Sequence, residues 1–115
     1  MTEAGHAYSS IGELAPAIAS GKISPVALTQ ATLDRIARHN ETLCAYITVM
    51  TESALEEAGA AERRIAAGQY LGPLDGIPLA AKDLFASRGV RTTFGSPLYA
   101  DWLPNYDAAA GERLR

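Results

Sequence analysis

Apolar and polar positions alternate with helical spacing in the first part of the chain. Leu14 and Ile18 lie four residues apart within residues 11–20, so they share one face of a predicted helix. Gly21 follows at the position that a glycine often takes at a helix C-terminus. The pattern therefore predicts a first helix over residues 11–20.

A second helix is predicted to begin at Ser24-Pro25, because serine is a favoured N-cap and proline is favoured in the first helical turn. Apolar or small residues then recur on one side, and Asn40 suits the helix end. The residues of this stripe are Val26, Thr29, Leu33, Ile36 and Ala37.

Residues 45–49 are β-branched or aromatic in part and predict a short strand. A third helix is expected after it, with Ser53 and Glu56 as a capping box and Gly68 as its stop signal. Its buried stripe would consist of Ala54, Ala58, Ala61 and Ile65.

Beyond Leu71 the chain is interrupted by glycine and proline, and Asp75-Gly76 predicts a turn. Residues 77–81 are apolar and short enough for a buried strand, residues 92–96 predict a strand or a tight loop, and a last helical pattern begins at Asp107. Helices with short strands that have no evident partners suggest a piece of a larger sheet protein.

Composition narrows the function classes. The chain has 115 residues, a net charge of −3 and 48% hydrophobic residues, which fits one small folded domain. Acidic and basic residues are interleaved, so no footprint for nucleic acid or an anionic membrane is expected. There is no signal-peptide pattern and no apolar run of membrane-spanning length, and we expect a cytoplasmic protein. The single cysteine, Cys44, excludes an internal disulfide, and no metal-ligand spacing is present.

Lys82 is the residue whose setting is unusual for its type. It follows the apolar residues 77–81, and burial there would favour its neutral amine, which is a base. The alternative is an edge lysine whose amine reaches water. His6 and His39 lie in polar surroundings, where solvated side chains are expected.

Two blocks resemble the amidase-signature family. The stretch 72–84 reads Gly-Pro-Leu-Asp-Gly-Ile-Pro-Leu-Ala-Ala-Lys-Asp-Leu, and it resembles the family's segment around its catalytic lysine. Asp75 stands where His is common in that family. The stretch 89–96, Gly-Val-Arg-Thr-Thr-Phe-Gly-Ser, is similar to the segment that follows, and the predicted helices match the family in order.

The resemblance implies an amidase that hydrolyses carboxylic amides with a Ser-Ser-Lys triad, in which a neutral lysine is the base. Of that triad only Lys82 is present, since the Gly/Ser-rich signature with both serines would lie beyond Arg115. Residues 1–115 would then be the N-terminal portion of an α/β amidase domain, truncated and inactive alone. The resemblance implies a small-molecule amide substrate, no cofactor and no metal, and it leaves open a homodimer.

Two alternatives remain from the sequence. The chain could be a non-catalytic truncated or interaction protein, or it could be part of the glutaminase subunit of a glutamyl-tRNA amidotransferase, which belongs to the same family. In the intact enzyme we expect the Asp83 side chain to point away from the Lys82 amine and to bond to the backbone or a neighbouring loop. A close ion pair between the two side chains would favour the charged amine.

Overall fold

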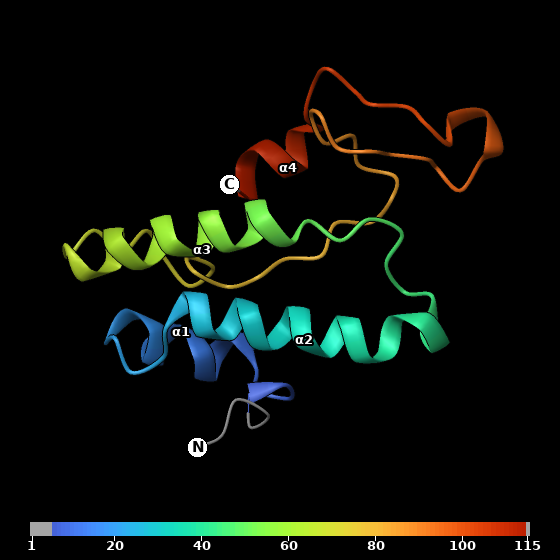
Figure 1. Cartoon of the computed structure of the whole chain (residues 1–115). Coiled ribbons are helices and arrows are strands. Elements are labelled where there is room, and N and C mark those ends of the chain that lie inside the picture. The colour runs from blue at the N-terminus through green and yellow to red at the C-terminus, as the bar shows by residue number, and fades with distance from the viewer. Residues whose placement is uncertain (1–5, 115) are drawn as a thin grey trace. The chain divides into compact units, whose positions relative to one another are not determined.

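The structure, a computed structural model, describes residues 6–114, and these fall into two units (Figure 1). The helical unit comprises residues 6–78 and holds helices α1, α2 and α3. The lysine unit comprises residues 79–114 and holds the short 3₁₀ helix η2 and helix α4. Each unit has its own set of hydrogen bonds.

Helix α1, Ile11–Ala19, confirms the first predicted helix. A capping box fixes its start: the Glu13 amide donates to the Ser10 hydroxyl oxygen (3.3 Å), and the Ser10 amide donates to the Glu13 carboxylate (2.7 Å). The Ser10 amide and, after it, the Ser10 hydroxyl donate to the Glu13 carboxylate, and these two bonds lower the pKa of Glu13. The helix ends just before Gly21, whose φ of +73° is one that glycine adopts without strain.

Helix α2, Pro25–Leu43, begins as predicted, with the Ala27 amide donating to the Ser24 hydroxyl oxygen (3.1 Å). It continues three residues beyond Asn40, the expected end. The Asn40 side chain instead bonds the Tyr46 backbone on both sides, accepting from its N–H (2.8 Å) and donating to its C=O (2.9 Å). Residues 45–49 are therefore a loop tied to the helix, and the strand predicted there is wrong.

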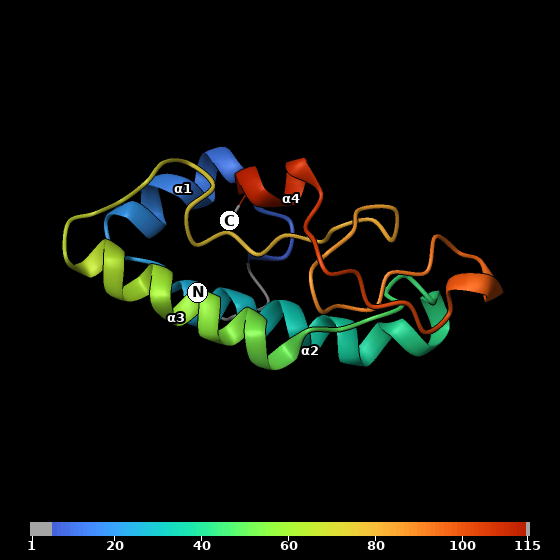
Figure 2. The ribbon, with the colours of Figure 1, turned by 90° about the horizontal axis from the view of Figure 1, so that it is seen from above.

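Helix α3, Thr51–Ala66, begins two residues before the predicted capping box, and that box is absent. Met50 occupies the N-cap without a side-chain bond, and the Ser53 hydroxyl donates backward to the Met50 carbonyl (3.4 Å). The predicted stop holds, since Gly68 follows the helix with φ +77°. Helices α2 and α3 pack side by side and run in opposite directions (Figures 1 and 2).

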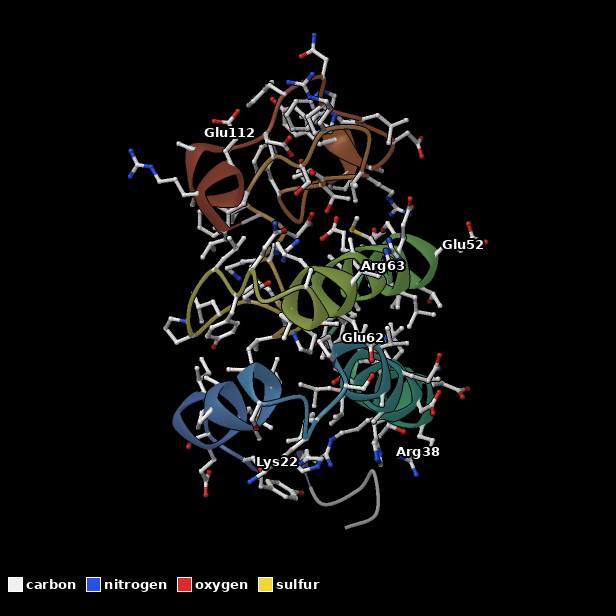
Figure 3. All side chains as sticks on the ribbon, turned by 90° about the vertical axis from the view of Figure 1, so that its left-hand side faces the viewer. Lys22, Arg38, Glu52, Glu62, Arg63 and Glu112 are labelled. Atoms are coloured by element: carbon white, nitrogen blue, oxygen red, sulfur yellow. The ribbon has the colours of Figure 1, made fainter. Side chains whose placement is uncertain are left out.

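The core of the helical unit is small and joins all three helices. Leu14, Ile18 and Leu28 are buried together, and Ile65 and Ile77 are partly buried against them. The predicted positions Ala58 and Ala61 are also buried, and their small side chains allow close helix packing. Charged residues such as Lys22, Arg38 and Glu52 project away from the helices (Figure 3).

An ion pair holds the segment that follows α3. Arg64 donates through Nε and Nη2 to the carboxylate of Asp75, whose side chain is only 4% exposed. The same carboxylate accepts from the Leu71 amide (3.0 Å), which closes the predicted turn. The next residue must be glycine: Gly76 has φ +81°, and a Cβ there would lie 2.9 Å from the Pro25 side chain.

Residues 77–81 do not form the predicted buried strand. No strand occurs within residues 6–114, and Leu79 is 66% exposed. A strand needs backbone partners beside it, and this segment has none among the described residues that would make a ladder. The α/β sheet is thus not formed by this part of the chain. No helix of residues 6–114 is both long and apolar enough to cross a membrane.

The Ser24 cap is expected to stabilise the helical unit more than Ser53 does. Ser24→Ala removes the hydroxyl that satisfies a free amide of α2, and it should lower the free energy of unfolding by about 1 kcal/mol. Ser53→Ala, the matched control, should change it by less than about 0.5 kcal/mol, because Ser53 does not cap α3. Urea unfolding followed by helical circular dichroism measures both. Equal losses in the two variants would contradict this assignment of the caps.

Candidate functional site

Lys82 lies in the lysine unit on exposed, irregular backbone. Its carbonyl oxygen accepts from the Phe85 amide (3.0 Å), so the chain turns directly after it. The sequence left two settings open for Lys82, burial at the end of a strand or an edge lysine whose amine reaches water. In the described chain Lys82 is exposed, because the segment before it lacks strand partners. Neither ion pair found in residues 6–114 involves the Lys82 amine.

Asp83 turns away from that amine and bonds a loop ten residues later. One carboxylate oxygen accepts from the Thr93 amide (2.8 Å), and the other accepts from the Thr93 hydroxyl. The backbone repeats the link, since the Phe94 amide donates to the Asp83 carbonyl oxygen (3.1 Å). The predicted orientation of Asp83, toward the backbone of a neighbouring loop, is confirmed. We call this set of three bonds the Asp83–Thr93 clamp.

The clamp favours the charged form of Asp83. The hydrogen bond from the Thr93 hydroxyl is the main cause of a lowered pKa for this carboxyl, followed by the bond from the Thr93 amide. Weaker contributions come from the Gly95 amide and from the positive charge of Arg91, and partial burial opposes them. Asp83 is therefore held as an anion by groups other than Lys82.

The loop 92–96 is the tight-loop alternative of the two predicted for it. Phe94 and Gly95 both have left-handed backbone, with φ of +53° and +68°. This conformation is unusual for phenylalanine, and its ring contacts two other aromatic rings. The Phe94 ring stacks on Trp102 at 5.4 Å between centroids and meets the edge of Tyr99 at 5.3 Å. These ring contacts support the strained residue next to Thr93.

Backbone hydrogen bonds join the segment before this loop to a segment after it. Backbone bonds join Thr92 to Trp102 (3.1 Å), Gly89 to Pro104 (2.9 Å) and Ala108 to Ala86 (2.8 Å), so residues 86–92 and 102–108 run side by side in opposite directions. The carboxylate of Asp107 accepts from the Arg88 amide (2.8 Å). The spacing is irregular, and no ladder of a regular strand forms. The short elements beside them are η2, Pro97–Tyr99, and α4, Ala109–Leu114.

Ser96, which ends the loop 92–96, has a structural role in the described chain. The Ser96 hydroxyl oxygen accepts from the Leu98 amide (3.3 Å) and thereby caps η2. Among residues 6–114, no three His, Cys, Asp or Glu side chains are grouped as a metal site requires. Sequence reasoning missed Thr93 as the partner of Asp83 and Arg64 as the partner of Asp75. Both pairs join residues that are ten or more positions apart, which periodicity does not detect.

A protein-family model matches the part of the chain that contains this site. The model of the family described as Amidase matches residues 27–115, which include the Lys82 block, the clamp and the α2–α3 pair. The chain belongs to the amidase family.

Curated amidase relatives agree with this membership. The chain is 47% identical over 106 residues to the glutamyl-tRNA(Gln) amidotransferase A subunit of Salinispora tropica, and 50% identical over 106 residues to that of an Azoarcus species. Each match covers 92% of this chain and 22% of the relative. The amidase chain therefore spans about a fifth of the length of these relatives.

Solved structures give the same result for the fold. The chain superposes with a TM-score of 0.86 and 33% identity on a chain from a vestigial protein complex linked to the origins of an s-triazine catabolic enzyme. An inhibitor-bound form of that complex matches equally well. The superposition covers 92% of this amidase chain and 23% of the other chain. The helices and loops described above are thus those of an amidase-family structure.

The clamp predicts how Asp83 titrates. A carbon-detected NMR titration should give the Asp83 carboxyl a midpoint below the ordinary value of about 3.9. Thr93→Val should move the midpoint up toward that value. Thr92→Val is the matched control: Thr92 is equally buried, but its hydroxyl donates to the Val90 carbonyl, so the Asp83 midpoint should stay in place. A midpoint that Thr93→Val does not move would contradict the clamp.

The same shift fixes the pH dependence of stability. Since the folded state lowers the pKa of Asp83, the clamp stabilises the fold above the ordinary pKa of an aspartate. This contribution should be lost as the pH falls through the lower, folded-state pKa. Stability measured by urea unfolding should therefore decline more steeply below about pH 4 in the wild-type chain than in Thr93→Val.

Proposed function

We propose that this chain supplies the general base, Lys82, of an enzyme that hydrolyses carboxylic amides. The observation that carries the proposal is the family match across the Lys82 block, together with the orientation of Asp83. A lysine can act as a base only when its amine is neutral, and a carboxylate bonded to it would oppose that state. Both Asp83 oxygens accept from Thr93, and neither ion pair within residues 6–114 involves the Lys82 amine.

The resemblance to the amidase-signature family supplies the remaining steps. A serine outside these 115 residues would attack the amide carbon, while its proton passes through a relay serine to the Lys82 amine. The C–N bond would then break, and the proton would leave with the ammonia or amine. Water would release the acid from the serine. The complete enzyme would carry a mixed sheet flanked by helices, and it would need no cofactor for these steps.

A second candidate is narrower in substrate. Several relatives at 41–50% identity are glutamyl-tRNA(Gln) amidotransferase A subunits. This similarity favours glutamine as the amide and a multi-subunit complex as the working form. A non-catalytic role is the opposing case, and the experiment below distinguishes it from the role of Lys82 as the base.

The experiment places this chain in a complete relative. Residues of the Salinispora tropica protein that match this chain are replaced by the chain itself, and ammonia release is measured with glutamine, propionamide and benzamide. Lys82→Ala should lower kcat by about 10²–10⁴-fold, the usual contribution of a general base. Lys82→Arg should be nearly as damaging, because a guanidinium does not lose its proton in proteins.

The chain carries its own control, since its only other lysine is Lys22. Lys22 is exposed in the α1–α2 loop, so Lys22→Arg should leave kcat unchanged. An active chimera that keeps normal turnover at neutral pH after Lys82→Arg would refute the proposal, and a chimera without activity would favour the non-catalytic role.

A further inference from the structure

The residue after Lys82 has every hydrogen-bond acceptor directed at one distant loop. Both Asp83 carboxylate oxygens and its backbone carbonyl oxygen accept bonds from Thr93 and Phe94. A surface aspartate ordinarily bonds water, whereas the carboxylate of this one accepts from the amide and the hydroxyl of Thr93. Such charge-assisted bonds are stronger than neutral ones and fix the direction of the side chain. The backbone at residue 83, which is bonded to Lys82, is thereby held in place.

The partner of Asp83 is itself fixed. Thr93 is 6% exposed, and its hydroxyl donates to Asp83 while accepting from the Gly95 amide (3.1 Å). The hydroxyl thus uses its donor and an acceptor at once, which valine cannot do and serine can. The carbonyl of the same residue accepts from the Ser96 amide (2.9 Å). Thr93 is therefore a rigid anchor rather than a side chain that could follow a moving Asp83.

The clamp matters because of the chemistry of its neighbour. An aspartate beside a lysine can form an ion pair with it, and an ion pair favours the ammonium over the amine. The neutral amine would then be populated only at higher pH. The bonds from Thr93 direct both carboxylate oxygens toward loop 92–96, and neither ion pair within residues 6–114 involves the Lys82 amine.

We propose that Asp83, anchored by Thr93, is a positioning residue for Lys82. The clamp fixes the backbone that carries the Lys82 side chain, and it keeps the carboxylate away from the lysine amine. This inference rests on the proposed function of Lys82 as the base. It assigns to Thr93 a part in the reaction that acts through Asp83, without contact with the substrate.

The test uses the active chimera and its pH–kcat profile. Thr93→Val frees the carboxylate, so the acid limb of the profile should move up by about one pH unit, which lowers kcat about tenfold at a pH below the limb. The KM should stay within about twofold, since the substrate does not touch Thr93. Thr93→Ser keeps the hydroxyl and should restore the wild-type limb. Thr92→Val is the control and should leave the limb unchanged.

A double variant separates the effect of the Asp83 charge from the effect of the clamp on the backbone. In Asp83→Asn/Thr93→Val there is no carboxylate to pair with Lys82, so the limb should return to the wild-type pH while kcat on its plateau stays reduced. A purely structural role would lower the plateau in both variants without moving the limb. If Thr93→Val fails to fold, Thr93→Ala takes its place, because it also lacks the hydroxyl that bonds Asp83, and the same upward shift of the limb is expected.

The outcomes keep the two proposals apart. If Lys82→Ala abolishes turnover while Thr93→Val leaves both the limb and kcat unchanged, the positioning role is wrong and Lys82 stands as the base. If Thr93→Val lowers only the plateau, the clamp is structural and the inference is likewise wrong. If Lys82→Ala keeps its turnover, the proposed function itself fails, whatever Thr93 does.

Discussion

The bonds from Thr93 to the Asp83 carboxylate are the interaction on which the lysine unit depends. This unit has no strand among its described residues and only two short helical elements, so regular hydrogen bonding cannot order it. The clamp instead closes a loop of ten residues, and the stacked Phe94 and Trp102 rings stabilise the left-handed turn beside it. Residues near Lys82 are consequently held by side-chain bonds and irregular backbone bonds rather than by secondary structure.

The helical unit uses the same device at its last turn. Its core contains few large side chains, and many apolar residues of the chain stay exposed. Asp75 adds to this small core by accepting bonds from both Arg64 and the Leu71 amide. Gly76, which has no side chain, lets the backbone come close to Pro25. Two aspartates eight positions apart thus each tie an irregular segment to a distant residue. In both cases a buried or partly buried carboxylate is satisfied by more than one donor, which makes its position specific.

The sequence predicted what depends on neighbours along the chain. Three helices, the Ser24 cap and the stop at Gly68 follow from spacing and capping chemistry, and they are confirmed. The strands at 45–49 and 77–81 were wrong, because strand propensity does not supply a partner. The apolar neighbours of Lys82 single it out in the sequence, and its role as the base is what the family resemblance implies. Its exposure and the partner of Asp83 depend on contacts between distant residues, which a single sequence does not reveal.

Hydrogen exchange at the Thr93 amide tests the clamp most directly, because that N–H is the donor to the Asp83 carboxylate. Protection factors, corrected for the intrinsic pH dependence of exchange, are measured by NMR in the wild-type chain and in Asp83→Ala. We expect strong protection of Thr93 and Phe94 near neutral pH, loss of both in Asp83→Ala, and unchanged protection within α2. Equal protection of Thr93 in the two chains would contradict the clamp.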